Sequence, residues 1–353
     1  MRPNGYVSVV WVIVLAAAVT GCGSSSNSNQ PKPSGLIKRV FLTNEQANAV
    51  KMLDALKDTF TTKNLGASSP TKLVTAGGQT LVIDSTQPNV SVIDNTKESV
   101  TFSLLLNDVP VDVAITSDGK IAFAAERNSN AVQFATTADG AVSPSSISVP
   151  SPRRMVMSPN GSKLLVFSDP QSQLTGDTHS FFVIDTANKG VRQVTLPVLD
   201  QPFTAVFGSN DNQAFILNCA GECGTTHLVS TTQVPNQPSV VSVDFSGIFS
   251  TPAVPAAAGT AVAVPGATVG LLNGTSLFVA GTPAPGAVGS PVPACPLSRC
   301  GTLSVINTGS LTAGTAIPIT DGLHEKMALA AGGKLYIGAS ACTVEPGAAP
   351  NTV

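Results

Sequence analysis

The chain has 353 residues, of which 42% are apolar and only 11% are charged, and its formal net charge is −2. This high apolar content with low net charge excludes a disordered chain, and the small charged fraction excludes helical bundles and coiled coils. Lys and Arg number 19 against 21 Asp and Glu, so the basic surplus of a nucleic-acid binder is missing and no nucleic-acid partner is expected. The 31 Gly and 26 Pro are typical of many short strands joined by turns.

Residues 1–22 are predicted to be an export signal rather than part of the fold. Arg2 gives a short positive region, and 7–19 is an apolar run below the roughly 20 residues that span a bilayer comfortably. The run ends in the motif VTGC at 19–22, which resembles the bacterial lipobox: a branched residue and two small residues before a Cys. We therefore expect Cys22 to be the lipid attachment site of a bacterial lipoprotein. The alternative is an ordinary cleaved signal with an incidental Cys.

Residues 23–36 have almost nothing to bury and are predicted to be a flexible tether. The folded part, residues 37–353, is then expected outside the cytoplasm, held on a membrane by acyl chains. Gly23 stands where many Gram-negative lipoproteins carry the Asp that retains them in the inner membrane. We therefore expect the outer membrane or the cell surface of a bacterial envelope.

One pattern recurs along the rest of the chain: an apolar run, a two-residue turn rich in Gly, Asn and Asp, and a second apolar run. Four of the turns follow a Pro by eight residues, and at this offset the first unit has Ser69, beside Pro70, and the last has His324. The match between units therefore extends beyond the turns. The turns are Gly77-Gly78, Asp118-Gly119, Asn160-Gly161, Asn210-Asp211, Asn273-Gly274 and Gly332-Gly333.

Each apolar run is predicted to be a strand, as in the pair 111–116 and 121–126. The runs are short, rich in Val, Ile and Phe and almost uncharged, as strands covered on both faces should be. Asn-Gly and Asp-Gly between them are hairpin signals, because both turn positions can take positive φ. A third strand follows in most units, such as 89–96 or 180–187, and a fourth after it, such as 99–106. Four repeated antiparallel strands predict the blades of an all-β propeller, in which stacking around an axis covers both faces of every blade.

Three segments carry a more specific likeness: VFLTNEQANAVKMLD (40–54), NVSVIDNTKESV (89–100) and PVDVAITSDGKIAFAAERNSNAVQF (110–134). They resemble the YVTN-type β-propeller repeat family, whose consensus is roughly a Pro, an SPDGK-like turn, a YVTN-like strand and SVIDT. The resemblance covers most of residues 37–342. It implies a β-propeller of four-stranded antiparallel blades and says little about function, because propellers host enzymes, binders and scaffolds alike.

Two incomplete units leave the number of blades open. Residues 40–60 match the second and third strands of a unit without a first strand, and the last unit, from His324, ends before a third strand. Either residues 40–62 complete the last unit, which gives six blades, or the chain is a fragment of a seven-bladed protein. We expect the fragment, because seven separate second strands can be counted. Cys342 also favours it, since it occupies the position that Cys219 has in its own unit but lacks the partner.

Five of the six Cys remain for the folded part. Cys219 and Cys223 lie in one loop and Cys295 and Cys300 in another, and disulfides are the default in an exported protein. Such local bridges stabilise by only about 2 kcal/mol each, so we expect them to brace long loops; cross-pairing between the loops stays open. A metal site at Cys219, Cys223 and His227 is the alternative, but it shows only three ligands with an uncommon spacing, so no metal is expected.

Enzyme signatures are mostly absent: we find no G-x-S-x-G, no Walker loop and no dinucleotide fingerprint. No cofactor is therefore expected, and the first hypothesis is a non-enzymatic scaffold for a protein or a small ligand. Long loops at 169–179, 219–227 and 281–300 are a possible surface for a partner. The alternative is a lactonase-like, metal-dependent hydrolase of the kind found on related propellers, with its site in the central channel.

A site for a ligand is expected at one mouth of the central channel. Residues at the Pro offset begin the innermost strand of each unit, so they should ring this opening. One interpretation is an anionic ligand held by Arg153, Arg154 and Lys326. The other is a set of solvated strand-end side chains, some of them paired with one another. The candidate residues are Asp112, Arg153, Arg154, His324, Glu325 and Lys326.

Overall fold

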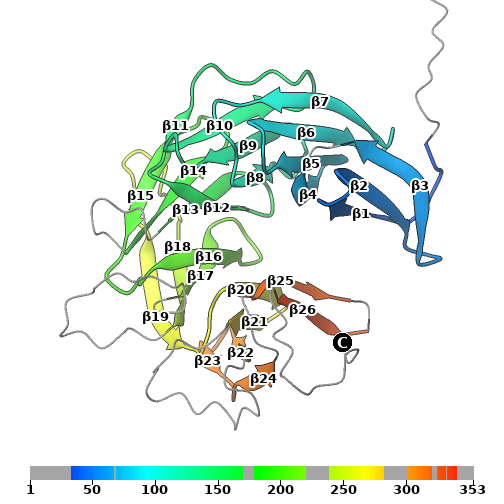
Figure 1. Ribbon diagram of the computed structural model, residues 1–353. Coiled ribbons are helices and arrows are strands. Elements are labelled where there is room, and N and C mark those ends of the chain that lie inside the picture. Colours follow the sequence, from blue (N-terminus) through cyan, green and yellow to red (C-terminus); the bar gives the residue numbers. More distant parts are fainter. Residues whose placement is uncertain are drawn as a thin grey trace, which may run out of the picture.

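The computed structural model describes residues 33–66, 69–169, 179–219, 238–281, 301–319, 324–330 and 332–339. Every regular secondary-structure element assigned in these ranges is a β-strand, and the strands form seven antiparallel sheets in chain order. The sheets, here named A to G, follow one another along an arc, from the blue sheet A to the red sheet G (Figure 1). In the part of the chain that is described, no helix is long and apolar enough to cross a membrane. The predicted all-β class is confirmed.

Four sheets have four strands each, and their first strands contact one another from sheet to sheet. Sheet B contains β4 (Pro70–Ala76), β5 (Gln79–Asp84), β6 (Asn89–Asp94) and β7 (Ser99–Leu105). Sheet C contains β8 (Asp112–Ile115), β9 (Ile121–Glu126), β10 (Ala131–Thr136) and β11 (Ile147–Ser148). Sheet D contains β12 (Pro152–Met157), β13 (Lys163–Ser168), β14 (Ser180–Asp185) and β15 (Val191–Thr195). Sheet E contains β16 (Pro202–Phe207), β17 (Gln213–Asn218), β18 (Ser239–Asp244) and β19 (Ala257–Ala263).

The other three sheets differ in strand number. Sheet A has three strands, β1 (Arg39–Asn44), β2 (Ala49–Asp54) and β3 (Thr59–Gly66). Sheet F contains β20 (Val269–Asn273), β21 (Ser276–Gly281), β22 (Gly301–Asn307), β23 (Thr312–Ala313) and β24 (Ile317–Ile319). Sheet G is the hairpin of β25 (His324–Leu329) and β26 (Leu335–Ala339). Residues of the first and last units thus lie in separate sheets.

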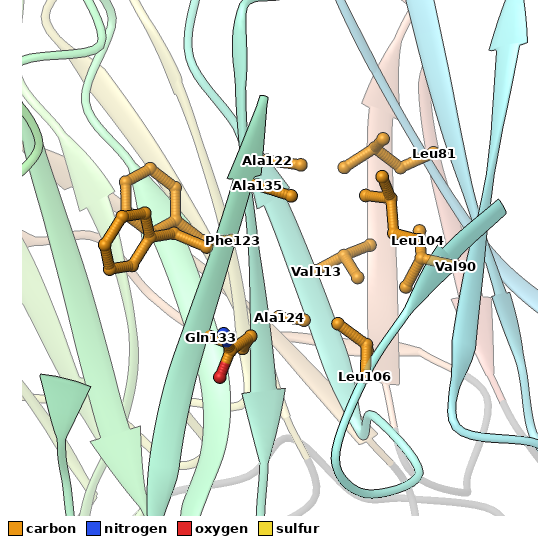
Figure 2. A pocket seen from close by; sticks show the side chains of 11 residues that line it. Leu81, Val90, Leu104, Leu106, Val113, Ala122, Phe123, Ala124, Gln133 and Ala135 are labelled. Atoms are coloured by element: carbon orange, nitrogen blue, oxygen red, sulfur yellow. The ribbon is translucent and has the colours of Figure 1, made fainter. Parts of the chain in front are cut away.

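Apolar side chains fill the space between neighbouring sheets. Figure 2 shows the contact between sheets B and C, where Leu81, Val90 and Leu104 face Val113 and Ala122 across a cavity of about 10 Å³. That volume is near the smallest that holds one water, so the two sheets are closely packed. Burial on both faces explains why the central strands are uninterrupted apolar runs in the sequence.

The chain enters two of the innermost strands, β4 and β12, through the same contact between a Ser backbone N–H and an Asn side chain. Ser151, directly before Pro152, has a φ of 38°, which is uncommon for a residue other than glycine. Its backbone N–H donates to Oδ1 of Asn130 in the preceding sheet at 2.8 Å. The same contact joins Ser69 to Asn48 at 3.2 Å. Pro152 and Pro202 begin innermost strands, as predicted, whereas β8 and β20 begin two and four residues after Pro110 and Pro265.

The turns between first and second strands lie where they were predicted, to within one residue at Asn273-Gly274, but the Asp-Gly and Asn-Gly turns differ in type. Both residues of Gly77-Gly78 have positive φ, as a two-residue hairpin turn requires. In Asp118-Gly119, Asn160-Gly161 and Asn273-Gly274, only the glycine has positive φ. The N–H of Gly119 donates to the carbonyl of Thr116 at 2.8 Å, so a tight turn precedes the left-handed glycine. The expectation that both positions are left-handed is wrong at these three turns.

Ser34, near the end of the predicted tether, already contacts sheet B. Its N–H donates to Oε2 of Glu98 at 2.7 Å, and its hydroxyl donates to Oε1 at 2.6 Å. Arg39 of β1 forms an ion pair with the same buried carboxylate at 2.5 Å. Glu98 thus joins the segment before β1 to the neighbouring sheet.

Candidate functional site

The innermost strands of four sheets contain an irregularity at the same position. The register between first and second strand shifts directly after Pro70, Pro152, Pro202 and His324. Each shift leaves one extra residue in the first strand, which is a β-bulge, and a bulge redirects the side chains beside it. The extra residue and the one after it are Thr71 and Lys72, Arg153 and Arg154, Phe203 and Thr204, and Glu325 and Lys326.

These bulges bring charged side chains from different sheets to the end of the ring at which the first strands begin. We call this region the channel mouth. It includes five of the six predicted site residues and two that the sequence analysis did not name, Lys72 and Phe203. Its members are Lys72, Asp112, Arg153, Arg154, Phe203, Glu325 and Lys326.

Asp112, at the start of β8, contacts three sheets on one side of the channel mouth. Its side chain is buried, and Oδ1 accepts a hydrogen bond from the N–H of Val113 at 2.7 Å and forms an ion pair with Lys72. Its Oδ2 accepts from the N–H of Met155 at 2.8 Å. A buried carboxylate needs such partners to offset its desolvation. Asp112 therefore joins sheets B, C and D.

Arg154 makes the corresponding contacts on the other side of the channel mouth. Its guanidinium lies 4.2 Å from the ring centroid of Phe203, and Arg153 lies 4.8 Å from the same ring. Arg154 also donates to the carbonyl of Thr268 at 3.4 Å and to Oε1 of Glu325 at 3.2 Å. Burial lowers the pKa of Arg154, and the Glu325 carboxylate opposes that shift. One arginine thus contacts sheet E, the segment before sheet F, and sheet G.

Positive charge exceeds negative charge at the mouth. Although Lys326 is exposed as a residue, its surroundings partly desolvate the ammonium group and lower its pKa, and the charges of Lys72 and Arg154 lower it further, against the weaker opposite effect of Asp112 and Glu325. Lys72 and Arg154 are paired with carboxylates. Among the ion pairs of the described ranges, none involves Arg153 or Lys326.

His324 lies apart from the exposed part of the mouth. Its side chain is fully buried, and its backbone carbonyl accepts a hydrogen bond from the hydroxyl of Thr268 at 2.7 Å. The neighbouring Glu325 and Lys326 are exposed. The structure therefore places His324 in the contact between sheets F and G.

Lys72 and Phe203 escaped the sequence analysis for different reasons. Lys72 follows Pro70 by two residues, the offset that Asp112 and Arg154 have from their own Pro, so the repeat contained the signal. Phe203 directly follows Pro202, but an apolar ring in a strand gives no sign that a bulge will turn it toward arginines of another sheet.

The remaining predicted sites lie mostly beyond the described ranges. Cys219 is buried directly after β17, with its Sγ 3.2 Å from the carbonyl oxygen of Gln201. The disulfides and the lipid attachment stay predictions. In the ranges that the structure covers, no three His, Cys, Asp or Glu side chains are grouped so that they could hold a metal ion. Outside these ranges lie Cys22, Cys223, His227, Cys295, Cys300 and Cys342, and most of the three long loops.

Comparison with known proteins identifies the fold. No protein-family model and no curated protein matches the chain. The dihydro-heme d1 dehydrogenase NirN in complex with DHE has a TM-score of 0.58 and 11% identity over 87% of this chain. This chain covers 60% of that protein's length.

Two further structures are similar over comparable lengths. Streptogramin B lyase has a TM-score of 0.54 and 12% identity, over 85% of this chain and 86% of the lyase. A functionally unknown protein from Desulfotomaculum acetoxidans DSM 771 has a TM-score of 0.53 and 14% identity, over 85% of this chain and 86% of that protein. Likeness at these identities extends to the fold alone. The chain has a β-propeller-like fold built from antiparallel sheets.

Proposed function

We propose that this protein is a lipid-anchored, extracytoplasmic β-propeller that binds an anionic ligand at the channel mouth and acts as an interaction scaffold. The observation that supports the ligand is the surplus positive charge around Arg153, Arg154 and Lys326. Arg153 is partly buried and is in none of the ion pairs of the described ranges; a desolvated charge without a counter-charge is costly, and an anion would offset that cost. The expected ligand carries carboxylate or phosphate groups.

The chemistry of the mouth suits such groups. The guanidinium groups of Arg153 and Arg154 both lie over the ring of Phe203, and a guanidinium held in this way presents several N–H donors in a fixed plane. Hydrogen bonds between charged partners are about twice as strong as those between neutral groups, and they strengthen where water is excluded. Lys326 adds a point charge from sheet G. Four cations and two carboxylates would thus surround a small oxyanion.

The finer assignments of the fold belong to the same proposal. The seven sheets of the described ranges favour seven blades over six. The repeated Pro, turn and SVIDT-like strand support the YVTN-type repeat, and the VTGC motif supports lipidation at the outer membrane or cell surface. No observation on the described residues favours the lactonase-like alternative.

Titration of the mature protein with phosphate, pyrophosphate and citrate, followed by calorimetry, tests the ligand site. We expect Arg153→Gln and Lys326→Gln each to weaken binding several-fold and the double variant on the order of tenfold or more, because each removes a charge-assisted contact. Lys334→Gln is the matched control, since Lys334 lies at the turn of the same hairpin, away from the mouth. Failure of the wild type to bind any of these anions, or equal binding by Lys326→Gln and Lys334→Gln, contradicts the proposal.

A separate experiment tests the anchor. The full-length precursor is expressed in a Gram-negative host with a labelled fatty acid, and membranes are separated from soluble protein. We expect label and membrane association for the wild type and for Ser24→Ala, and neither for Cys22→Ala. A labelled Cys22→Ala variant would disprove the anchor without bearing on the anion site.

A further inference from the structure

The two carboxylates of the channel mouth differ in exposure and in contacts. The side chain of Asp112 is only 2% exposed, accepts hydrogen bonds from two backbone N–H groups and forms an ion pair with Lys72. The side chain of Glu325 is 42% exposed, and its Oε1 lies 3.2 Å from Nη2 of Arg154. Asp112 is therefore fixed by its surroundings, whereas the carboxylate of Glu325 can turn toward water.

The contact between Arg154 and Glu325 is weak for an ion pair. Its length of 3.2 Å exceeds the roughly 2.7–2.9 Å that is typical of a hydrogen bond between charged nitrogen and oxygen. It joins one nitrogen to one oxygen, although a guanidinium can offer two parallel N–H groups to an oxyanion. Partly exposed pairs of this kind contribute little to stability, because water solvates the separated partners well. An anion with better contacts could therefore replace the carboxylate.

Arg154 and the backbone near Glu325 are held by other contacts. The guanidinium of Arg154 lies 4.2 Å from the ring centroid of Phe203, and its Nη1 donates to the carbonyl of Thr268 at 3.4 Å. The hydroxyl of Thr268 in turn donates to the carbonyl of the buried His324 at 2.7 Å, at the start of β25. The arginine and this end of β25 can thus keep their positions when the side chain of Glu325 moves.

A cation as buried as Arg154 needs a negative partner. Removing one partner of a desolvated ion pair is costly, because the remaining charge is left without compensation. An anionic ligand avoids this cost if it takes the place of the Glu325 carboxylate. Arg153 lies over the same ring as Arg154, and Arg154 is near enough to Lys326 for its charge to lower the pKa of that lysine. An anion with several oxygens therefore gains most from the exchange, because it can contact these cations together.

We propose that Glu325 is an internal competitor for the anion site: its carboxylate occupies Arg154 in the free protein, and the anionic ligand displaces it. This inference rests on the proposed function and names the residue that limits affinity there. Glu325 would thereby determine specificity, since an anion that offers only one carboxylate contact gains nothing over the contact that it replaces.

Calorimetric titration of the mature protein with pyrophosphate tests the proposal. Glu325→Gln should bind pyrophosphate several-fold more tightly than the wild type, because a neutral amide forms a weaker hydrogen bond with the guanidinium than a carboxylate does. Asp58→Asn is the matched control. It removes one exposed carboxylate from the turn between β2 and β3 of sheet A, and it should bind like the wild type.

Glu325→Asp separates the contact from the charge. Aspartate keeps the negative charge, but its side chain is one methylene group shorter, so it loses the contact with Arg154 while the arginine stays on Phe203. We therefore expect Glu325→Asp to bind pyrophosphate more tightly than the wild type as well. If Glu325 acted through long-range repulsion alone, Glu325→Asp would bind like the wild type.

The variants should keep the cooperative thermal transition of the wild type, because Glu325 is exposed. If one of them loses it, carbon NMR of the wild type decides instead. The side-chain carboxyl signal of Glu325 should shift as pyrophosphate is added, because the carboxylate leaves the guanidinium, and the signal of Asp58 should stay in place. An unchanged Glu325 signal at saturating pyrophosphate would overturn the proposal.

The titrations distinguish this inference from the proposed function. Binding by the wild type that Lys326→Gln weakens, without a gain for Glu325→Gln, would overturn the competitor role and leave the anion site intact. A gain for Glu325→Gln without one for Glu325→Asp would also overturn it, in favour of long-range repulsion. Absence of binding by the wild type and by Glu325→Gln would overturn the anion site and this inference together.

Discussion

Asp211 shows how one side chain joins two sheets. It lies in the turn that precedes β17 and is only 7% exposed. Its Oδ2 accepts hydrogen bonds from the hydroxyls of Ser158 and Ser162 at 2.7 and 2.6 Å, and its Oδ1 accepts from the N–H of Asn160 at 3.1 Å. Burial raises the pKa of Asp211, but these hydrogen bonds outweigh it and lower the pKa below 3.8. The carboxylate therefore holds the turn of sheet D against sheet E.

Asp211→Asn should reduce the free energy of unfolding by about 1–2 kcal/mol at pH 7, because a charged acceptor of several hydrogen bonds is lost. A lowered carboxyl pKa adds stability that is present above the ordinary pKa and lost as the pH falls through the folded value. The difference in the free energy of unfolding between the wild type and Asp211→Asn should therefore become smaller below pH 3.8. Urea unfolding at pH 7 and pH 3 measures this. Asp244→Asn is the control, since Asp244 accepts a hydrogen bond from the N–H of Ser246, two residues later in the turn that follows β18. An equal loss of unfolding free energy in both variants would contradict the role of Asp211 between sheets.

Single residues at the mouth were predictable only as far as the repeat places them. The Pro offset located Arg153 and Arg154, because each unit starts its innermost strand at the same point. Their stacking on Phe203 depends on a bulge and on a second sheet, and neither leaves a mark on the local sequence. For the same reason the sequence could not show that His324 is buried while Lys326 is exposed.

Whole strands were predicted far better than single side chains. The observed bounds of β9 coincide with the predicted apolar run 121–126, and β8 lies within the predicted run 111–116, because a strand covered on both faces has no polar interruptions. The outermost strands were harder to predict. β11 and β23 have two residues each, and β23 is exposed. Exposed edge strands are short and carry little apolar patterning, and β3 escaped prediction as well.

Neighbouring turns also contact one another, which a repeat pattern does not reveal. A Cβ on Gly77 would lie 2.2 Å from the backbone of Asp118 and Gly119, in the turn of the next sheet. Gly78, beside it, has open space around the same position. Both glycines have positive φ, at 55° and 81°. An alanine at residue 78 would therefore have only the conformational cost of a positive φ. An alanine at residue 77 would have the same cost and a steric clash in addition.

Gly77→Ala should lower the free energy of unfolding substantially more than Gly78→Ala. An alanine with positive φ costs about 1–2 kcal/mol at either position, and at residue 77 the Cβ additionally forces two backbones apart. Urea unfolding of both variants measures the difference. Equal losses would show that the turns of sheets B and C do not need their close approach.

The molecule as a whole was predictable where its repeat dominates. Periodic turns and two-faced strands indicate stacked blades, and the similar solved structures share the fold. Function does not follow in the same way: a protein named as a dehydrogenase and another named as a lyase both have this architecture. The repeat positions side chains at one end of the ring, and the residue types at those positions determine what the ring can bind.

At the scale of the whole ring, anion binding should weaken as the pH rises. Burial and the charges of Lys72 and Arg154 lower the pKa of Lys326 below 10.5, so this lysine loses its charge at a lower pH than a free one. A bound anion stabilises the charged form and raises that pKa, so binding takes up protons in the window between the two values. Arg153 and Arg154 stay charged there.

Calorimetric titration with phosphate from pH 8 to pH 10.5, in buffers of different ionisation enthalpy, should show both the falling affinity and the proton uptake. Lys326→Gln should abolish the proton uptake and leave a weaker affinity that changes little with pH, while Lys334→Gln should behave like the wild type. Added salt should weaken binding by every form, because the remaining charges are partly screened at 0.1 M, where the Debye length is about 10 Å. Proton uptake that persists in Lys326→Gln would place the titrating group elsewhere on the ring and remove Lys326 from the site.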